Sequence, residues 1–481
     1  MFLGIDLGTS GIKGLILDET QTAVASAHAG LTVERSHAGW SEQDPAQWIT
    51  AMEAVLDQLH RDHGKQLSAV RGIGFSGQMH GATLLDAQDK VLRPCILWND
   101  TRSAKQARAL DEDEQFRRLT GNIVFPGFTA PKINWVTQNE PDIANAIRRV
   151  LLPKDYLRLW FTGEYVSEMS DASGTSWLDV EKRSWSSPLL EACGLTVDHM
   201  PTLVEGSQSS GTVRKTLADR YGMGNAVQVA GGAGDNAASA IGLGATTAGS
   251  AFVSLGTSGV LFAANDQFLP NAESAVHAFC HALPETWHQM GVFLSATDSL
   301  NWWANRCGST AEELTAQVGD SDLTPSPITF LPYLSGERTP HNDADIRGAL
   351  IGLDHSHTNA DITQAVMEGV AFALCDSRAA LESAGTRLDR VMAVGGGTRS
   401  EAWLQMIANA LGVPVDLPAD GDFGAAFGAA RLGMLCVEQG TTDAICTAPN
   451  IRRSFEPMAQ QAYGDAYQRY RALYPAIKSV L

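Results

Sequence analysis

Asp6 and the turn that follows it are the first residues in the chain that could do chemistry. Asp6 lies at the end of the apolar run 2–6, where a carboxylate is costly unless it is paired. The turn at 8–11, Gly-Thr-Ser-Gly, offers two hydroxyls and several backbone N–H groups, and its glycines let an oxyanion approach the backbone. A hydrated Mg²⁺ beside bound phosphates would pair with Asp6. The alternatives are an ordinary hairpin and an Asp that accepts hydrogen bonds from neighbouring backbone.

The pentapeptide Leu-Gly-Thr-Ser-Gly occurs twice, at residues 7–11 and again, 248 residues later, at 255–259. Each copy follows one strand-like apolar run and precedes another. Two domains of similar construction explain the repeat, and their hairpins could hold a polyphosphate from opposite sides. Neither a P-loop pattern nor a G-x-G-x-x-G after the first strand is present in the sequence. The predicted domains are 1–245 and 246–481, with the boundary near 242–249.

A second acidic residue, Asp235, follows the glycine-rich stretch 230–234 at an apparent helix start. Asp is a favoured N-cap, so a purely structural role is one alternative. Three glycines before an N-cap are unusual, and they indicate a close approach to the backbone. The loop Gln78-Met79-His80 follows a predicted strand at 70–75, where open α/β sheets bind ligands. A lone loop histidine is otherwise more often structural.

Alternating strands and helices must position these residues. Apolar runs at 2–6, 12–17 and 23–29 predict a strand meander. Asp44 and Pro45 then begin a predicted helix whose apolar residues recur at helical spacing. In the second half, a strand at 391–394 runs into three glycines at 395–397, and a helix is predicted from Ser400. This mixture predicts an α/β protein.

The amino-acid composition limits which kinds of partner the protein could bind and in which cellular compartment we expect it. The chain has 481 residues, 44% hydrophobic and 19% charged, with a formal net charge of −19. An acidic surface argues against nucleic acid or an anionic membrane as the main partner. Seven widely spaced cysteines without C-x-x-C indicate free thiols in a reducing cytoplasm. The first residues lack a signal-peptide pattern, and the uncharged stretch 236–265 is interrupted by Gly, Ser and Thr, so we expect a cytoplasmic protein.

In order and type, these motifs resemble those of the FGGY carbohydrate kinases. The matching segments cover essentially the whole chain and are 4–10, 78–81, 127–135, 230–236, 254–259, 348–353 continuing to Glu368, and 395–397. Segments 78–81, 98–100, 152–156 and 330–340 are similar to those of bacterial members that act on D-xylulose. The Arg-Glu pair that follows the Gln in glycerol-phosphorylating members is absent from this sequence.

The resemblance implies an actin-like and hexokinase-like fold, with two ribonuclease-H-like domains and an interdomain cleft. It implies ATP and Mg²⁺, and transfer of phosphate to the terminal hydroxyl of a small sugar, with D-xylulose as the first expectation. Ribulose, L-xylulose and gluconate remain alternatives, as does a non-catalytic actin-like nucleotide-binding protein. The expected partners are the sugar and ATP, without nucleic acid or membrane, and a homodimer is left open.

The resemblance also implies roles for individual residues. Asp235 would be the catalytic base, and Asp6 would assist it, with both carboxylates on the metal side. The residues expected around the sugar are Gln78, Met79, His80, Trp98 and Asn236. Those expected around the nucleotide are Thr9, Ser10, Lys13, Gly256, Thr257, Gly396, Gly397 and Ser400.

Overall fold

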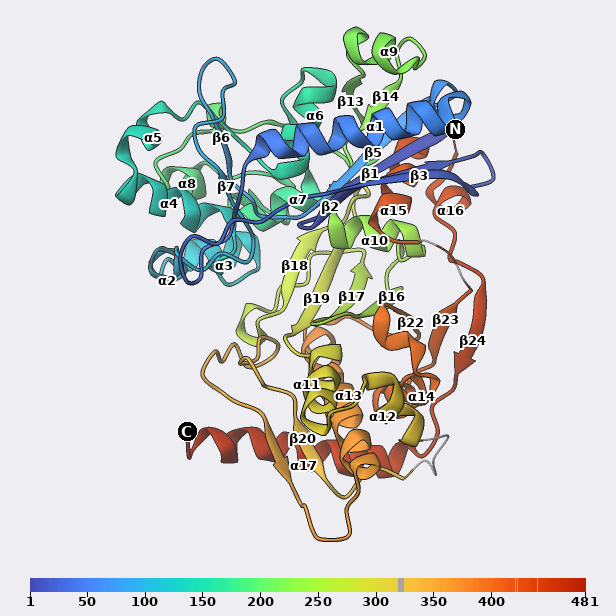
Figure 1. Ribbon diagram of the computed structural model, residues 1–481. Helices are drawn as coiled ribbons and strands as arrows, with labels where there is room; N and C mark the ends of the chain where they lie inside the picture. Colours follow the sequence, from blue (N-terminus) through green and yellow to red (C-terminus); the bar gives the residue numbers. More distant parts are fainter. Residues whose placement is uncertain (319–323, 420, 422, 439) are drawn as a thin grey trace.

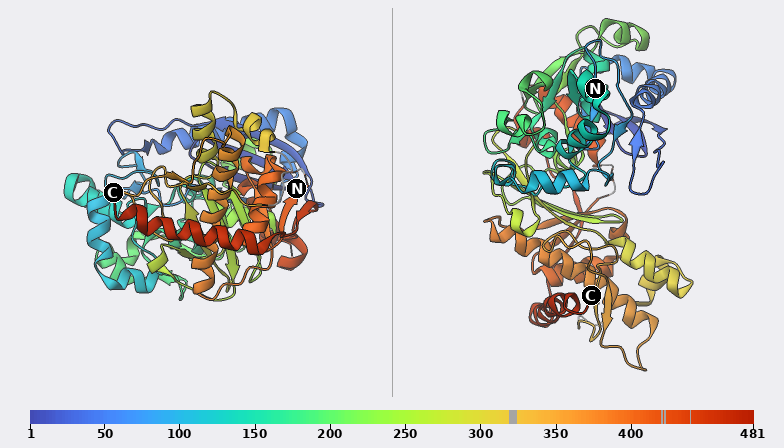
Figure 2. Two further views of the ribbon diagram at one scale, coloured as in Figure 1. Left: turned by 90° about the horizontal axis from the view of Figure 1, so that it is seen from below. Right: turned by 90° about the vertical axis from the view of Figure 1, so that its left-hand side faces the viewer.

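The protein has two lobes, each built around a large sheet. The computed structural model describes residues 1–318, 324–419, 421, 423–438 and 440–481. Within these residues the two large sheets have seven strands each. One sheet lies in the upper, blue-to-green lobe of Figure 1 and the other in the lower, yellow-to-red lobe. Figure 2 shows the same elongated arrangement from the side, with the two chain ends in different lobes.

The first sheet has the spatial order β13-β14-β5-β1-β2-β3, and β15 also pairs with β5. Its strands are β1 Phe2–Leu7, β2 Gly11–Leu17, β3 Ala23–Gly30, β5 Gly72–Gly77, β13 Ser209–Thr212, β14 Gln228–Ala230 and β15 Ala233–Gly234. β1 and β2 form an antiparallel hairpin, whereas β1, β14 and β15 all run parallel to β5. The carboxyl ends of β1, β5 and β15 therefore meet at one edge.

The second sheet repeats this arrangement, with the order β18-β19-β17-β16-β22-β23-β24. Its strands are β16 Ala251–Leu255, β17 Gly259–Asn265, β18 His277–Cys280, β19 Trp287–Phe293, β22 Val391–Val394, β23 Val415–Pro418 and β24 Ile451–Phe455. Again a central antiparallel hairpin, β16–β17, is followed by two parallel neighbours, β22 and β23. The duplicated α/β fold predicted from the repeated pentapeptide is confirmed, and both copies form the turn of the central hairpin.

Helix α1, Pro45–Ser68, covers the first sheet as the sequence predicts. Asp44 is its N-cap and accepts a hydrogen bond from the Ala46 N–H at 2.9 Å. Trp48 and Met52 are among the residues that form its buried face. The predicted strand at 70–75 is instead β5, two residues further on, because residues 67–70 still belong to the turn that ends α1.

A helix from the second half of the chain packs directly on the first sheet. This helix is α15, Ala425–Val437, drawn in red among the blue and green elements of the upper lobe in Figure 1. A Cβ on Gly4 of β1 would lie 1.8 Å from the Ala426 carbonyl oxygen, and one on Gly74 of β5 would lie 1.8 Å from that of Ala429. Glycine on the strands is therefore what allows the close helix–sheet contact.

Helix α10, Asp235–Leu243, lies against α15 and links the lobes. A Cβ on Gly428 of α15 would lie 1.7 Å from the Ala238 carbonyl oxygen. Arg431 of α15 donates to the carbonyls of Ile241 and Gly242, at 2.9 and 3.1 Å, at the carboxyl end of α10. The division of the chain at residue 245 stays a prediction, since the two halves share this pair of helices.

The remaining described elements complete the two lobes. The other α-helices are α2 Ala104–Asp111, α3 Glu114–Thr120, α4 Thr129–Asn139, α5 Pro141–Ala146, α6 Pro153–Thr162, α7 Met169–Ala172, α8 Ser187–Glu191, α9 Lys215–Tyr221, α11 Thr297–Cys307, α12 Ala311–Val318, α13 Asn359–Ser383, α14 Glu401–Leu411, α16 Thr442–Ile445 and α17 Gln460–Lys478. Short 3₁₀ turns are η1 Ser173–Thr175, η2 Val197–His199, η3 Ala272–Ser274 and η4 Gly396–Arg399. Small strand pairs are β4 Glu42–Gln43 with β7 Cys95–Ile96, β6 Thr83–Leu85 with β8 Arg149–Leu151, β9 Val166–Glu168 with β12 Thr202–Val204, β10 Leu178–Asp179 with β11 Ser184–Trp185, and β20 Thr329–Leu331 with β21 Ala349–Ile351. Among the described helices, none has the length and apolarity needed to span a membrane.

Candidate active site

The two acidic residues singled out in the sequence come together at the edge where β1, β5 and β15 end. Asp6 lies beside Ser76 in the β1–β5 register, and Ser76 lies beside Ala233 of β15. Asp235 follows β15 directly and is the first residue of α10. The fold thus places both carboxylates at one edge of the first sheet, although 229 sequence positions separate them.

The Asp235 carboxylate is held by its neighbour and not by helix capping. The N-cap of α10 is Gly234, so the alternative of an N-cap role for Asp235 is wrong. Its Oδ1 accepts hydrogen bonds from the backbone N–H and the side-chain amide of Asn236, at 2.7 and 2.9 Å. Burial, and then the nearby charge of Asp6, raise the pKa of Asp235 to about 6. A carboxylate of this kind is ionised at neutral pH and is a better proton acceptor than an exposed Asp.

The glycines before Asp235 are required by the protein's own backbone. Gly232 has φ +79°, and a Cβ there would lie 2.2 Å from the Phe75 carbonyl oxygen. A Cβ on Gly231 would lie 2.3 Å from the carbonyl oxygen of Glu205. The close approach to the backbone that the sequence predicts is therefore present. At these two glycines, however, the approaching groups are carbonyl oxygens of the protein itself.

A buried charge cluster fixes the loop that carries Asp235. Lys154 on α6 pairs with Asp155, Glu168 and Asp171, with N–O distances of 2.8, 3.2 and 2.9 Å, and all four side chains are fully buried. Two contacts lead from this region to the glycine loop. Arg158 donates to the Gly231 carbonyl, and Ser170 accepts from the Gly234 N–H at 3.1 Å. No role for these residues was predicted from the sequence, because their charges pair only after folding.

His80 is held in one tautomer at the carboxyl end of β5. Its Nδ1–H donates to the Gly174 carbonyl at 2.8 Å, which leaves Nε2 as the acceptor nitrogen of a neutral ring. Burial, with Lys132 as the next cause, lowers the pKa of His80 to about 3, so the ring stays neutral. Its carbonyl accepts from Lys132 Nζ at 2.8 Å and from Thr129 Oγ1 at 3.1 Å. The ring also stacks on Phe128, with centroids 4.6 Å apart.

Met79 connects His80 with the Asp235 loop. The Met79 side chain is buried, and its Sδ lies 2.8 Å from the position that a Cβ on Gly234 would occupy. A Cβ on Gly174 would lie 2.3 Å from Cε1 of His80. Larger residues at these two glycines would displace Met79 and His80, so both are needed for the local geometry.

Side chains from the second lobe complete the surroundings of His80. The rings of His277 and Phe279, both on β18, lie next to Phe128, with centroid distances of 5.7 and 6.1 Å. Arg338 lies beside His277, with Nη1 3.4 Å from Nε2. None of these second-lobe residues was assigned a role from the sequence, because they come from two segments that are about 60 positions apart in the chain and meet only in the fold.

A chain of hydrogen bonds connects the first hairpin turn with the Gln78 loop. Trp98 Nε1 donates to Thr9 Oγ1 at 3.0 Å, and Thr9 Oγ1 donates to Gln78 Oε1 at 3.1 Å. Gln78 Nε2 in turn donates to Gln43 Oε1 at 2.9 Å. Gln43 Nε2 donates to the Thr9 carbonyl at 2.8 Å. The Thr9 hydroxyl proton and the Gln78 amide are therefore engaged within the protein.

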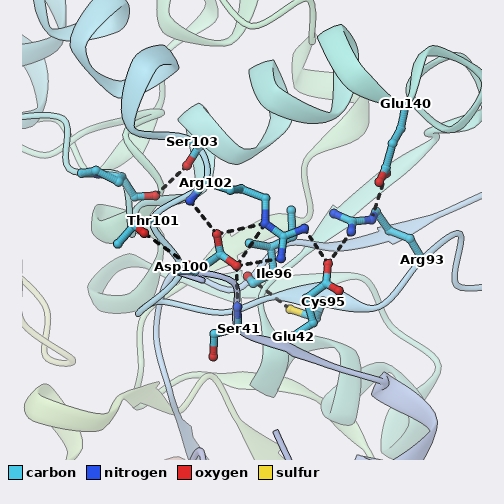
Figure 3. A network of polar contacts seen from close by, with 12 residues as sticks. Ser41, Glu42, Arg93, Cys95, Ile96, Asp100, Thr101, Arg102, Ser103 and Glu140 are labelled. Carbon is cyan, nitrogen blue, oxygen red and sulfur yellow. Dashed lines mark hydrogen bonds and ion pairs between the residues drawn. The ribbon is translucent and has the colours of Figure 1, made fainter. Parts of the chain in front are cut away.

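The loop that presents Trp98 rests on the ion-pair network shown in Figure 3. The Asp100 carboxylate accepts from the Ser41 N–H at 2.6 Å and pairs with Arg102 at 2.7 Å. Arg102 also pairs with Glu42 at 2.8 Å, and its guanidinium lies 3.6 Å from the centroid of the Trp40 ring. The Asp100 and Arg102 side chains are buried, whereas Trp98 itself is 49% exposed beside the first hairpin turn.

The second hairpin turn is tied to the start of α11. The Gly256 carbonyl accepts from Thr297 N–H and Oγ1, at 2.9 and 2.8 Å, and the Thr257 carbonyl accepts from the Ala296 N–H at 2.8 Å. Thr257 itself is exposed, as is Ser10 in the first turn. Each turn thus has an exposed hydroxyl residue, and hydrogen bonds from elsewhere in the protein to its carbonyl groups hold its backbone in place.

Two cavities border the glycine segment after β22. One, of about 500 Å³, lies between the lobes and is lined by Ser239 and Leu243 of α10 and by Gly395, Pro418 and Phe423 of the second half. The other, of about 420 Å³, is lined by residues of α11, α12 and α14 together with Gly396, Gly397 and Ser400. Three of the predicted nucleotide residues therefore line one cavity.

Gly396 and Gly397 differ in what surrounds them. A Cβ on Gly396 would meet nothing within 4 Å, whereas one on Gly397 would lie 2.8 Å from the Leu255 Cβ. Ser400 caps α14 by accepting from the Trp403 N–H at 3.3 Å, as the predicted helix start requires. Only Gly396 therefore faces open space, and Gly397 packs against the second hairpin.

Asp6 and Asp235 are the residues that could face a divalent cation. No group of three or more His, Cys, Asp or Glu side chains in the described part of the chain could by itself hold a metal. Mg²⁺ is usually bound through one or two carboxylates, water and substrate phosphates, and two adjacent carboxylates fit that donor set. Lys13 lies opposite Asp6 in the β1–β2 register, at the base of the first turn.

Similarity to known proteins extends over most of the chain. Residues 1–242 match the N-terminal domain of the FGGY family of carbohydrate kinases, and residues 251–436 match its C-terminal domain. The chain belongs to the FGGY family of carbohydrate kinases. Xylulose kinase from Escherichia coli K12 is 48% identical over 480 residues, covering 98% of each chain.

Solved FGGY-type structures superpose on the entire chain. The crystal structure of a "xyloylose kinase from Brucella ovis" has 59% identity and a TM-score of 0.99, with complete coverage of both chains. Xylulose kinase from Rhodospirillum rubrum has 28% identity and a TM-score of 0.93, covering 100% of this chain and 99% of that one. The family and the actin-like, hexokinase-like fold expected from the motifs are confirmed.

Proposed function

We propose that this protein transfers the γ-phosphate of ATP to the terminal hydroxyl of D-xylulose, giving D-xylulose 5-phosphate. The observation that carries the proposal is Asp235, a carboxylate with raised pKa next to Asp6 at the end of the central strands. Relatives named xylulose kinase, matched over 98% of the chain, support the substrate. Membership of a carbohydrate kinase family supports ATP as the phosphate donor.

Asp235 is the proposed general base. Phosphoryl transfer needs alignment and charge neutralisation more than covalent help from the protein. The Asp235 carboxylate accepts the proton of the attacking sugar hydroxyl, while its Oδ1 is oriented by Asn236. Its pKa of about 6 keeps it ionised at neutral pH and still basic enough to take that proton.

Asp6 is the proposed partner of Asp235 on the metal side. Mg²⁺ held near Asp6 and Asp235 would supply positive charge opposite the phosphates. The two carboxylates repel each other, which is one cause of the raised pKa of Asp235. A bound cation or a proton relieves this repulsion, so the pair is suited to a site that both binds Mg²⁺ and accepts a proton from the sugar.

His80 and Met79 are the proposed sugar contacts. Since Nδ1–H of His80 donates to Gly174, its Nε2 accepts a hydrogen bond from a sugar hydroxyl. The buried Met79 side chain lies between His80 and Gly234 and contributes an apolar wall. We retain Gln78 and Asn236 as proposed residues of the same site, where they act through the hydrogen bonds that they make to Thr9 and Asp235. Trp98, which the resemblance assigns to the sugar, is proposed to act instead on the first hairpin turn, through its hydrogen bond to Thr9.

The two hairpin turns are the proposed phosphate-binding elements. Backbone N–H groups of the turns at 8–11 and 256–259 bind phosphate oxygens, and the exposed hydroxyls of Ser10 and Thr257 add donors. Thr9 supports the turn through Trp98 and Gln78. Lys13 contributes positive charge near Asp6, and the nucleoside occupies the cavity beside Gly396 and Ser400.

An ATP-consumption assay with a panel of acceptors tests the proposal. D-xylulose, D-ribulose, L-xylulose, gluconate and glycerol are offered at equal concentration, with a no-sugar control. We expect the highest kcat/KM with D-xylulose and little ATP consumption without sugar. A higher kcat/KM for another acceptor would reject D-xylulose as the substrate, and ATP consumption independent of sugar would reject the kinase assignment.

A further inference from the structure

The segment that carries Arg338 is fixed on both sides of this residue. Thr339 Oγ1 accepts from the Val292 N–H at 3.0 Å, and the Thr339 N–H donates to the Val292 carbonyl at 3.0 Å. Glu337 Oε1 accepts from the Leu294 N–H at 3.0 Å, just after β19. Both neighbours of Arg338 are therefore hydrogen-bonded to the backbone at the carboxyl end of β19 in the second sheet. The Arg338 side chain points elsewhere, toward His277 and the first lobe.

Arg338 makes contacts but no charge pair. Its Nη1 lies 3.4 Å from His277 Nε2, and its guanidinium carbon lies 4.7 Å from the centroid of the Phe125 ring in the first lobe. No carboxylate in the described ranges lies within ion-pair distance of this guanidinium, although 17 other arginine and lysine side chains in those ranges form ion pairs. Burial lowers the pKa of Arg338 and raises that of Glu337 to about 8, so the adjacent Glu337 gives little compensating charge.

The Arg338 guanidinium lies at the His80 end of the proposed sugar site. Phe125 and Phe128 pack against each other, with centroids 5.6 Å apart, and Phe128 stacks on His80. Arg338 contacts His277, and the ring centroids of His277 and Phe128 lie 5.7 Å apart, which places the guanidinium beside the aromatic cluster that contains His80. On the other side of His80, the Met79 side chain lies against Gly234, the residue before Asp235. The order along the site is thus Asp235, Met79, His80, Arg338.

A buried guanidinium without an anionic partner is costly, and it is satisfied when a ligand supplies oxygen acceptors. Its planar fork of N–H donors suits two neighbouring oxygens. In a ketopentose whose terminal hydroxyl reaches Asp235, the oxygens at the opposite end are the carbonyl and the adjacent hydroxyl. Both can accept hydrogen bonds, and neither is charged.

We infer that Arg338 is a specificity-determining residue for the sugar, and that it donates hydrogen bonds to the carbonyl end of the acceptor from the second lobe. This inference rests on the proposed function. The contact joins a sugar held by His80 of the first lobe to a residue anchored on β19 of the second. Sugar binding therefore favours the arrangement in which the two lobes are together.

The test compares the KM for D-xylulose and for ATP in wild type, Arg338→Met and Arg338→Lys. Methionine keeps much of the length without charge, and lysine keeps the charge without the fork. We expect Arg338→Met to raise the KM for D-xylulose at least tenfold and Arg338→Lys to raise it several-fold. The KM for ATP should change less than threefold in both variants. Arg387→Met, at an exposed arginine in the loop before β22, is the matched control and should change neither KM.

Each result has a separate meaning. If wild type does not phosphorylate D-xylulose, the proposed function fails. If wild type is active and either folded Arg338 variant keeps the wild-type KM for D-xylulose, the inference about Arg338 is wrong. Equal increases in both KM values, with a lowered melting temperature, would also overturn it by showing a structural role. Should Arg338→Met not fold, Arg338→Lys is judged on the same criteria.

Discussion

The indole Nε1 of Trp98 donates a hydrogen bond to the hydroxyl of Thr9 at 3.0 Å. This bond joins an exposed tryptophan, anchored through Asp100 and Arg102, to the turn proposed to bind phosphate. The Thr9 hydroxyl in turn donates a hydrogen bond to Oε1 of Gln78, the residue before Met79 and His80. One hydrogen-bond chain therefore links the proposed nucleotide side of the site with the proposed sugar side.

Trp98→Phe should weaken ATP binding more than sugar binding. Phenylalanine keeps a ring at this position but removes the N–H that Thr9 accepts. Loss of one such bond typically costs about 0.5–1.5 kcal/mol, which corresponds to a rise of roughly two- to tenfold in the KM for ATP. Steady-state kinetics checks this, with Trp160→Phe on α6 as the control. A rise in the sugar KM alone would instead show that Trp98 contacts the sugar directly.

Gly396→Val should impair nucleotide binding without disturbing the fold. A side chain there would enter the open space beside the glycine segment, since a Cβ would meet nothing within 4 Å. We expect the Kd for ATP, measured by calorimetry, to rise about tenfold, or ~1.4 kcal/mol. Gly397→Val should act differently and lower the melting temperature, because its Cβ would lie 2.8 Å from the Leu255 Cβ. Unchanged ATP affinity in Gly396→Val would remove this glycine from the nucleotide site.

His80→Ala should raise the KM for D-xylulose by roughly tenfold or more. The substitution removes the Nε2 acceptor, and an unpaired buried hydrogen-bonding group costs about 1–3 kcal/mol. The KM for ATP should change little. His60→Ala is a matched control, since His60 Nδ1 also contacts a backbone carbonyl, that of Tyr221, at 3.0 Å, on the exposed side of α1. A sugar KM equal to that of wild type would place His80 outside the site.

The pH dependence of kcat/KM should show an acidic limb near pH 6. Asp235 must be ionised to accept a proton, so activity falls as the pH drops through its pKa of about 6. His80 does not give this limb, because its pKa is about 3. Removing the negative charge at Asp6 lowers the pKa of Asp235, so residual activity of Asp6→Asn should have its limb at lower pH. A limb that stays in place would show that Asp235 is not the titrating group.

The sequence predicts the parts of this protein that depend on local patterns. Both hairpins, the α1 start at Asp44 and the α14 start at Ser400 follow from turn and cap residues, and the repeated pentapeptide predicts the duplicated sheet. These features need only neighbouring residues. The family resemblance then added roles for residues that no local rule distinguishes.

What the sequence did not predict depends on contacts between distant segments. The Gln43 side chain takes part in four hydrogen bonds, with Thr9, Thr32, Trp48 and Gln78, yet a single Gln before a helix has no recognisable pattern. Arg338 lies inside a segment that resembles the family, but its proximity to His80 comes from the packing of two lobes. The N-cap alternative for Asp235 was wrong by one residue, because Gly234 already has the extended backbone of a cap.

The most direct test of the central claim is the turnover of Asp235→Asn with saturating ATP and D-xylulose. The amide keeps an oxygen that can accept from the Asn236 N–H, and the cap at Gly234 is unchanged, but it cannot take a proton. We predict a kcat lower by about 10²–10⁴-fold, the usual cost of removing a general base. Calorimetric affinity for D-xylulose and the melting temperature should stay close to those of wild type. A kcat within a few-fold of wild type would contradict the account, and so would a loss of folding that removes all binding together.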